Sequence, residues 1–121
     1  MDEWLDAHRR ADLASLAELY EPGARHSTAA DYHGREAIRD MFEQSLAVSG
    51  HFRAYNRDCV AQGGYAWETG IAVQRVAVSE ERPFDLVGRY MMLLARQPDG
   101  SWLIRHLVGA PVRQEPVHND G

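Results

Sequence analysis

Two apolar segments joined by a Pro-Asp-Gly turn limit most strongly the folds that this chain can adopt. The segments cover residues 84–97 and 101–108, and the turn between them is Pro98-Asp99-Gly100. Proline presets φ, aspartate hydrogen-bonds to its own backbone, and glycine accepts a positive φ, so this tripeptide predicts a tight turn. Trp102 then opens the second strand of an antiparallel hairpin. We therefore expect an antiparallel sheet in the C-terminal half of the fold.

The order of the other patterns predicts an α+β fold. Apolar spacing and chain breakers give helices over 2–10, 13–20 and 34–48, a short strand over 24–30, a loop over 31–34, and strands over 51–62, 65–79, 84–97 and 101–108. Helices followed by consecutive strands favour an antiparallel sheet packed against helices. We expect a single domain over residues 1–111. Residues 112–121 are polar and without periodicity, so we expect a flexible tail.

The composition is that of a small globular domain and argues against several functions. The chain has 121 residues, of which 45% are hydrophobic and 26% charged, which suits one compact core. A net charge of -5 argues against nucleic-acid binding, which needs a basic face. The sequence has no lysine, so Schiff-base chemistry on a lysine is excluded.

Cysteine usage and hydropathy indicate where the protein works. Cys59 is the single cysteine, so no disulfide can form within the chain, and a reducing compartment is expected. The N-terminus lacks the pattern of a signal peptide, and no apolar run is long enough to cross a membrane. We expect a cytoplasmic protein without a membrane partner. The six histidines lack the spacing of a zinc site, and no phosphate loop or dinucleotide motif is present, so we expect neither a metal nor a cofactor.

Short motifs follow one another in an order that is similar to a known superfamily. They are Ala11-Asp12 before a helix that ends at Leu19-Tyr20, the helix start Gly34-Arg35-Glu36-Ala37-Ile38, the strand positions Ala66, Glu68 and Gly70, the run Gly88-Arg89-Tyr90, and Asp99-Gly100-Ser101-Trp102 with Ile104. The ordered set spans residues 4–111 and resembles the nuclear transport factor 2-like superfamily. Within it, the nearest group is the SnoaL-like branch, which also resembles the association domain of calcium/calmodulin-dependent kinase.

The resemblance implies a cone-shaped fold and a set of candidate functions. In such a cone a curved antiparallel sheet wraps around N-terminal helices and leaves a pocket open at one end. Members are usually homodimers that pair through the outer face of the sheet. They include ketosteroid isomerases, polyketide cyclases, dehydratases, limonene-type epoxide hydrolases and non-catalytic binding or assembly domains, so the fold does not define the function.

Two of these activities lack their residues in this chain. Ketosteroid isomerases carry their catalytic aspartate about where Thr28 falls here, so that base is absent. The epoxide hydrolases place a tyrosine and an asparagine two residues apart, whereas Tyr55 and Asn56 are adjacent and would face opposite ways. Both activities are therefore disfavoured.

Glu68 is the leading acid–base candidate. Alternation along the strand 65–79 puts it on a face of small residues, which leaves volume for a pocket, so we expect that face to point inward. The opposite face, with Tyr65 and Trp67, then becomes the dimer surface, although the reverse phase stays open. Burial in a partly apolar pocket raises the pKa of a carboxyl group towards neutrality, which suits proton transfer. The alternative is an ion pair between Glu68 and a pocket arginine, Arg53 or Arg89.

Two further residues complete the predicted catalytic set. His106 lies on the last strand in phase with Trp102 and Ile104, and histidine is the side-chain type best suited to proton transfer near neutral pH. Tyr90 could polarise a carbonyl or orient a ligand with its hydroxyl. The structural alternatives, a hydrogen-bonded strand histidine and a core tyrosine, stay open for both.

The predicted ligand-binding residues surround this set. Met92 shares a face with Tyr90, and Tyr55 and Arg53 share a face of the strand 51–62, where they would form a polar mouth. If the opposite face of that strand is inward, Asp58 joins the pocket instead. Arg89 and His26, the latter on the short strand before the third helix, are the remaining ligand-binding candidates.

Two functions from different classes follow. The first is a cofactor-free isomerase, cyclase or dehydratase that acts on a small, apolar, carbonyl-bearing molecule, with Glu68 or His106 as base and Tyr90 as donor. The second is a non-catalytic dimeric module that binds a ligand or holds an assembly together. Ligand binding inside the cone is common to both.

Overall fold

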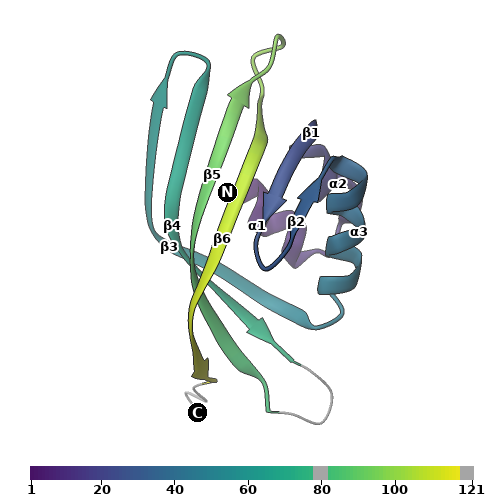
Figure 1. Cartoon of the computed structure of the whole chain (residues 1–121), viewed down its shortest axis with the longest axis vertical. Helices are drawn as coiled ribbons and strands as arrows, with labels where there is room; N and C mark the ends of the chain where they lie inside the picture. Colours follow the sequence, from purple (N-terminus) through teal and green to yellow (C-terminus); the bar gives the residue numbers. More distant parts are fainter. Residues whose placement is uncertain (78–81, 118–121) are drawn as a thin grey trace.

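The computed structural model describes residues 1–77 and 82–117, and this part of the chain forms three helices and one six-stranded sheet (Figure 1). The helices are α1 (Asp2–Arg9), α2 (Leu13–Glu18) and α3 (Arg35–Ser45). The strands are β1 (Tyr20–Ser27), β2 (Asp31–His33), β3 (Ser49–Gln62), β4 (Tyr65–Val76), β5 (Phe84–Arg96) and β6 (Trp102–Pro116). The predicted α+β class is confirmed.

The sheet is curved, unclosed and almost entirely antiparallel. Its strand order is β2-β1-β6-β5-β4-β3, and only the pair β1–β6 is parallel. In Figure 1 the helices lie beside the β1–β2 end, while the upper ends of β3 and β4 stand far from them. This confirms the cone-shaped curved sheet wrapped around N-terminal helices.

The predicted turn has the expected geometry. Gly100 adopts φ +89°, its N–H donates to the carbonyl of Gln97 at 2.9 Å, and the Asp99 carboxylate accepts from the Ser101 N–H at 2.9 Å. Trp102 opens β6 as expected. The turn thus joins β5 and β6 into a hairpin that runs the full length of the sheet.

Apolar side chains from the helices and from the inner face of the sheet make one core. Its fully buried members include Leu16, Tyr20, Ile38 and Met92, and Trp4 and Phe42 pack among them. This face of the sheet is called inner below, and the opposite face outer. The burial of these side chains fixes the helices on one side of the sheet, since apolar surface is stabilised by its removal from water.

Register shifts interrupt the pairing of β3 and of β6, and one shift in each strand changes the phase of predicted site residues. In β3, Asn56 and Arg57 together oppose a single residue of β4, and Asn56 adopts φ +52°. In β6, Arg105 is the extra residue, because Leu94 pairs with Ile104 and Leu93 pairs with His106. An extra residue turns every later side chain to the other face.

Several predicted boundaries are wrong. The loop expected over 31–34 contains β2, which pairs with β1, and the helix expected over 13–20 ends at Glu18 because Tyr20 begins β1. The flexible tail expected over 112–121 is wrong for 112–116, which belong to β6 and pair with the start of β5. Residues 78 and 79 of the predicted strand and residues 118–121 of the predicted tail lie outside the described residues.

Candidate functional site

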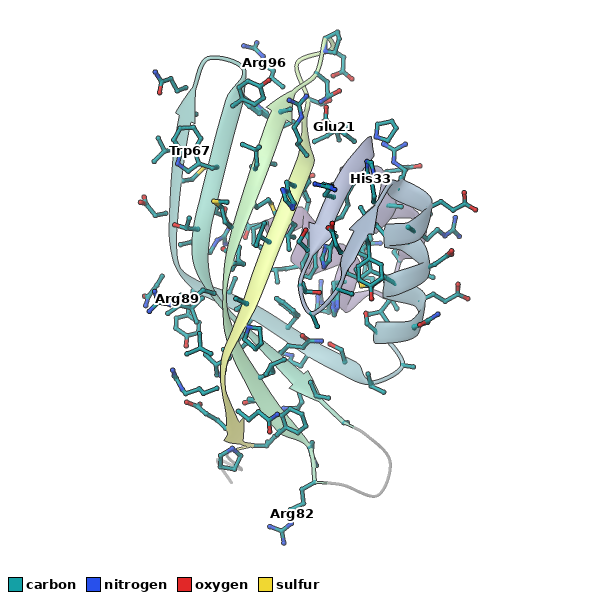
Figure 2. All side chains as sticks on the ribbon, in the orientation of Figure 1. Glu21, His33, Trp67, Arg82, Arg89 and Arg96 are labelled. Carbon is teal, nitrogen blue, oxygen red and sulfur yellow. The ribbon has the colours of Figure 1, made fainter. Side chains whose placement is uncertain are left out.

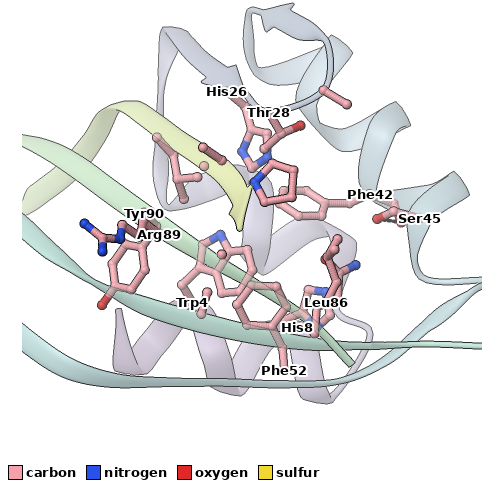
Figure 3. Close-up of a pocket in the computed structure, with 18 of the residues that line it drawn as sticks. Trp4, His8, His26, Thr28, Phe42, Ser45, Phe52, Leu86, Arg89 and Tyr90 are labelled. Atoms are coloured by element: carbon pink, nitrogen blue, oxygen red, sulfur yellow. Dashed lines mark hydrogen bonds between the residues drawn. The ribbon is translucent and has the colours of Figure 1, made fainter. Parts of the chain in front are cut away.

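A cavity of about 260 Å³ lies between the helices and the inner face of the sheet (Figure 3). Its walls are mainly aromatic, from Trp4 and His8 of α1, Phe42 of α3 and Phe52 of β3. Further lining side chains are Met1, His26, Thr28, Met41, Ser45, Ala72, Gln74, Leu86, Tyr90 and Leu107. Ring faces and aliphatic carbons therefore dominate, with a few polar atoms at fixed positions.

A buried chain of three hydrogen-bonding side chains ends at the cavity. The Trp4 Nε1–H donates to the Tyr20 hydroxyl at 3.1 Å, and that hydroxyl lies 2.9 Å from Nδ1 of His26. Tyr20 is fully buried, so its own proton needs an acceptor nearby, and His26 Nδ1 meets that need. Burial also raises the pKa of Tyr20, so the hydroxyl keeps its proton.

The chain fixes which nitrogen of His26 carries the proton. Burial, and secondarily the nearby charge of His106, lowers the pKa of His26 to about 4, so the ring is neutral at pH 7. A neutral imidazole has one N–H and one lone pair. Because Nδ1 accepts from Tyr20, we assign the proton to Nε2 from the hydrogen-bond network. No described residue hydrogen-bonds to Nε2, so His26 offers the cavity a donor.

His8 is a functional candidate that sequence reasoning missed. Its ring stacks on Trp4 with centroids 5.0 Å apart, it is 3% exposed, and burial lowers its pKa, so it is also neutral at pH 7. In the sequence it shares a face of the first helix with Trp4, which by itself indicates only packing. Nothing in the pattern signals a polar atom on a cavity wall.

A second polar network lies on the inner face of β4 and β5. The Tyr90 hydroxyl donates to the Glu68 carboxylate at 2.5 Å, and the Arg57 guanidinium donates to the same carboxylate at 3.3 Å. Arg57 also bonds to Asp2 at the start of α1 at 2.6 Å. Burial, and then the hydrogen bond to Glu68, raises the pKa of Tyr90. Each of these polar groups thus finds a partner within the protein.

Gly70 allows this second network to form. A Cβ atom at Gly70 would lie 2.8 Å from the Tyr90 ring, which is closer than real Cβ contacts allow. The absence of a side chain therefore lets the Tyr90 ring lie across β4. From there its hydroxyl reaches Glu68, two residues earlier on the same strand as Gly70.

The structure places the predicted catalytic residues in two different environments. Glu68 is 7% exposed on the inner face, as predicted, but it does not line the cavity, and its arginine partner is Arg57 rather than Arg53 or Arg89. Tyr90 lines the cavity with its ring. The predicted phase of His106 with Ile104 is wrong because of the bulge at Arg105, and His106 Nε2 contacts the Ser27 hydroxyl at 2.8 Å instead.

The predicted ligand-binding residues are also divided. His26 lines the cavity. Arg89 also borders it, but its exposed side chain extends away from the helices (Figure 2). Met92 is fully buried in the core. The polar mouth expected from Arg53 and Tyr55 is wrong: both are exposed and pair with outer-face residues of β4, because Phe52 takes the inner position.

The bulge at Asn56 also determines on which face of β3 Asp58 lies, a question that the sequence left open. Asp58 pairs with Thr69, so it lies on the outer face and does not join the pocket. Arg57 takes the inner position beside Glu68 instead. A positive φ at a non-glycine residue, here Asn56, gives no clear signal in a single sequence, although asparagine tolerates it better than most residues.

The described residues contain neither a metal-binding cluster nor a membrane-spanning helix. Over residues 1–77 and 82–117, no group of three or more His, Cys, Asp or Glu side chains is arranged to hold a metal ion. Within the same ranges, no helix has the length and apolar character needed to cross a membrane.

The chain belongs to the SnoaL-like domain family, whose model matches residues 1–104. A comparison with curated proteins finds no significant sequence relative. Among solved structures, the chain is similar to LinA, with a TM-score of 0.84 and 14% identity over 98% of this chain and 84% of that one.

Two further solved structures, whose names indicate different functions, have the same fold. A ketosteroid isomerase-like protein from Erwinia carotovora atroseptica has a TM-score of 0.78 and 12% identity over 93% of this chain and 90% of that one. A protein described as a calcium/calmodulin-dependent protein kinase II association domain from Xanthomonas campestris has a TM-score of 0.80 and 22% identity over 92% and 81%. At these identities the likeness shows the nuclear transport factor 2-like fold alone.

Proposed function

We propose that the cavity beside His26 binds a small, mostly apolar molecule that carries a carbonyl group. The observation that carries the proposal is that His26 lines an aromatic cavity and that its Nε2, to which we assign the proton, has no described hydrogen-bond partner. Aromatic walls favour a flat or ring-shaped molecule, and a single N–H donor favours a ligand with an acceptor atom. A carbonyl oxygen satisfies that donor.

The size of the cavity limits the ligand. Its volume of about 260 Å³ lies just below the usual range of ligand pockets, which begins at roughly 300 Å³. A molecule of one or two rings therefore fits better than a steroid-sized one. The two-ring ketone 2-tetralone is a suitable probe, and tetralin, which lacks only the carbonyl oxygen, is its matched control.

Binding can be followed through Trp4, which lines the cavity. We expect 2-tetralone to quench or shift the tryptophan emission with saturation and to bind about fivefold or more tightly than tetralin, as one hydrogen bond contributes roughly 1 kcal/mol. His26→Phe should remove this preference while preserving ring shape. Equal affinity for ketone and hydrocarbon in the unaltered protein would reject the proposal.

Catalysis without a cofactor, as an isomerase, cyclase or dehydratase, is a second candidate. The family includes isomerases and cyclases. The specific observation that favours it is the contact between Tyr90, which lines the cavity, and Glu68 behind it. A proton moving between a bound molecule and Glu68 would pass through the Tyr90 hydroxyl, while the His26 N–H stabilises charge on the carbonyl oxygen.

Exchange of the α-protons of 2-tetralone in D₂O, followed by NMR, tests this second candidate. We expect the protein to accelerate exchange, and Glu68→Gln and Tyr90→Phe to lower the rate to a similar extent, since both belong to one path. His106→Ala is the matched control, because His106 contacts Ser27 rather than the cavity. Unchanged exchange in both Glu68→Gln and Tyr90→Phe would leave ligand binding as the function.

We also propose that the protein forms a homodimer through the outer face of the sheet, an arrangement that would equally suit the alternative assembly role. Large apolar side chains on that face are exposed in the single chain, among them Val60 at 44% and Met91 at 45%. Met91→Glu should shift the mass measured by sedimentation from dimer to monomer, because a carboxylate would be buried at the interface. A monomer in the unaltered protein would reject this proposal.

A further inference from the structure

The Nδ1 atom of His8 has no hydrogen-bond partner within residues 1–77 and 82–117. It is fully buried, and among the described residues no donor or acceptor reaches it. The side chain sits within an aromatic group, stacked on Trp4 and with its centroid 5.3 Å from Phe52. A buried polar atom without a partner is uncommon in a native interior and calls for an explanation.

Neighbouring polar groups on α1 do not supply the partner. The N–H of Trp4 is used by Tyr20, and Asp6 is bound by Arg9 and Arg10 at the protein surface. His8 instead borders two hollows, the aromatic cavity and a second one of about 210 Å³ beside Arg9 and His51. These two hollows are therefore the spaces beside His8 from which we expect the missing partner to come.

His8 and His26 are both placed around Phe42. The centroid of the Phe42 ring lies 6.2 Å from that of His8 and 5.3 Å from that of His26, both in edge-on geometry. Both histidines line the same cavity, as Figure 3 shows. One small molecule lying against Phe42 can therefore extend from one imidazole to the other.

We propose that His8 is a second ligand-binding residue and that the ligand carries a hydroxyl group in addition to its carbonyl. This inference rests on the proposed function, since it concerns the same cavity. The network does not fix the tautomer of His8, and a hydroxyl suits either one, because it donates to a lone pair and accepts from an N–H. The ligand class is thus a hydroxylated cyclic ketone or aldehyde, with the carbonyl at His26 and the hydroxyl at His8.

Four related probes separate the two contacts. They are tetralin, 2-tetralone, 5,6,7,8-tetrahydro-2-naphthol and 6-hydroxy-2-tetralone, which carry neither group, the carbonyl, the hydroxyl, and both. We expect the hydroxyl to improve the affinity of 2-tetralone about fivefold in the unaltered protein, the effect of one hydrogen bond. His8→Phe should abolish this gain, whereas His26→Phe should preserve it and abolish the gain from the carbonyl.

The outcomes distinguish this inference from the function on which it rests. If 2-tetralone binds better than tetralin but the hydroxyl adds nothing, the proposed function stands and the role of His8 is overturned, with water from the second hollow as its partner. A hydroxyl gain that persists in His8→Phe overturns it equally. If no probe binds, or the carbonyl adds nothing, the proposed function fails and the inference fails with it.

A measurement on the unaltered protein tests the contact between His8 and the hydroxyl even if the His8→Phe variant misfolds. The ¹⁵N chemical shift of His8 Nδ1 reports its hydrogen bonding directly. We expect 6-hydroxy-2-tetralone to move this shift and 2-tetralone to leave it nearly unchanged. Equal effects of the two compounds would contradict a contact between His8 and the hydroxyl.

Discussion

The two polar networks on the inner side of the sheet differ in how they end. The chain Trp4–Tyr20–His26 begins with a donor that has no acceptor capacity and ends at an imidazole whose Nε2–H has no described partner. The network of Arg57, Glu68 and Tyr90 is closed: the carboxylate receives both donors, and a second carboxylate, Asp2, holds the arginine.

This difference separates binding from support. In the closed network the donors are already used within the protein, so a bound molecule reaches Glu68 only through Tyr90, whereas the open network presents a preorganised donor to the cavity. Glu68, the leading acid–base candidate in the sequence, belongs to the closed network. In the open network His26 was a predicted ligand-binding residue, whereas Trp4 and Tyr20 look like core aromatics in the sequence.

The largest expected effect comes from breaking the closed network. Glu68→Ala leaves the Tyr90 hydroxyl without its acceptor and Arg57 without its inner partner. It should lower the free energy of unfolding by about 3–4 kcal/mol, as is typical when one member of a buried pair is removed. Urea unfolding measures this loss. The affinity for 2-tetralone should change less than about threefold, so a large loss of binding would show that the two networks are not separate.

The second effect comes from protonating the open network. The pKa of His26 is about 4 in the fold and 6.5 ordinarily, so between these values the unfolded chain binds a proton that the folded protein does not. Stability should be complete above pH 6.5 and should fall as the pH drops towards 4, by about 3 kcal/mol in total. His8, whose pKa is also lowered, acts in the same direction. The free energy of unfolding, measured at a series of pH values, should fall less steeply between pH 6.5 and 4 in His26→Phe than in the unaltered protein.

A smaller effect is expected from opening the chain in its middle. Tyr20→Phe leaves the Trp4 N–H and His26 Nδ1 without partners, which should cost about 2 kcal/mol of stability. It also frees His26 to change tautomer, so the preference for 2-tetralone over tetralin should decline. Calorimetry and the two binding constants check this. An unchanged preference would mean that Tyr20 does not position His26.

The smallest effect concerns the bulge that turns Arg57 inward. Asn56→Val puts a β-branched residue at φ +52° and should cost about 1–2 kcal/mol. Asn56→Gly is the matched control and should cost little, because glycine accepts this backbone. Equal stability of the two variants would show that the bulge relaxes and that Arg57 is held inward by other means.

The success of sequence reasoning follows the regularity of each strand. β4 and β5 pair without a bulge, so simple alternation placed Glu68, Tyr90 and Met92 on the inner face correctly. β3 and β6 contain bulges, so the same rule misplaced Asp58 relative to Phe52, misplaced His106 and missed Arg57. Tyr55 lies before the bulge and was misplaced because the wrong face of β3 was taken as inner. Bulges arise from how the sheet curves around the helices, which short-range patterns do not encode.

The cavity itself was harder to foresee. The two histidines on which the proposals rest, His8 and His26, come from different elements, and their lowered pKa values result mainly from burial in the folded protein. Whether a histidine packs in a core or borders a cavity depends on such long-range contacts. The Pro98-Asp99-Gly100 turn, by contrast, was predictable because its geometry is determined by three consecutive residues.

A ¹H–¹⁵N NMR spectrum of the imidazole of His26 at pH 7 tests the central claim most directly. We expect a neutral ring with the proton on Nε2 and a lone pair on Nδ1, and addition of 2-tetralone should shift the Nε2–H resonance while tetralin does not. A proton on Nδ1, or a charged ring at this pH, would contradict the assignment of His26 as the donor that the cavity presents to its ligand.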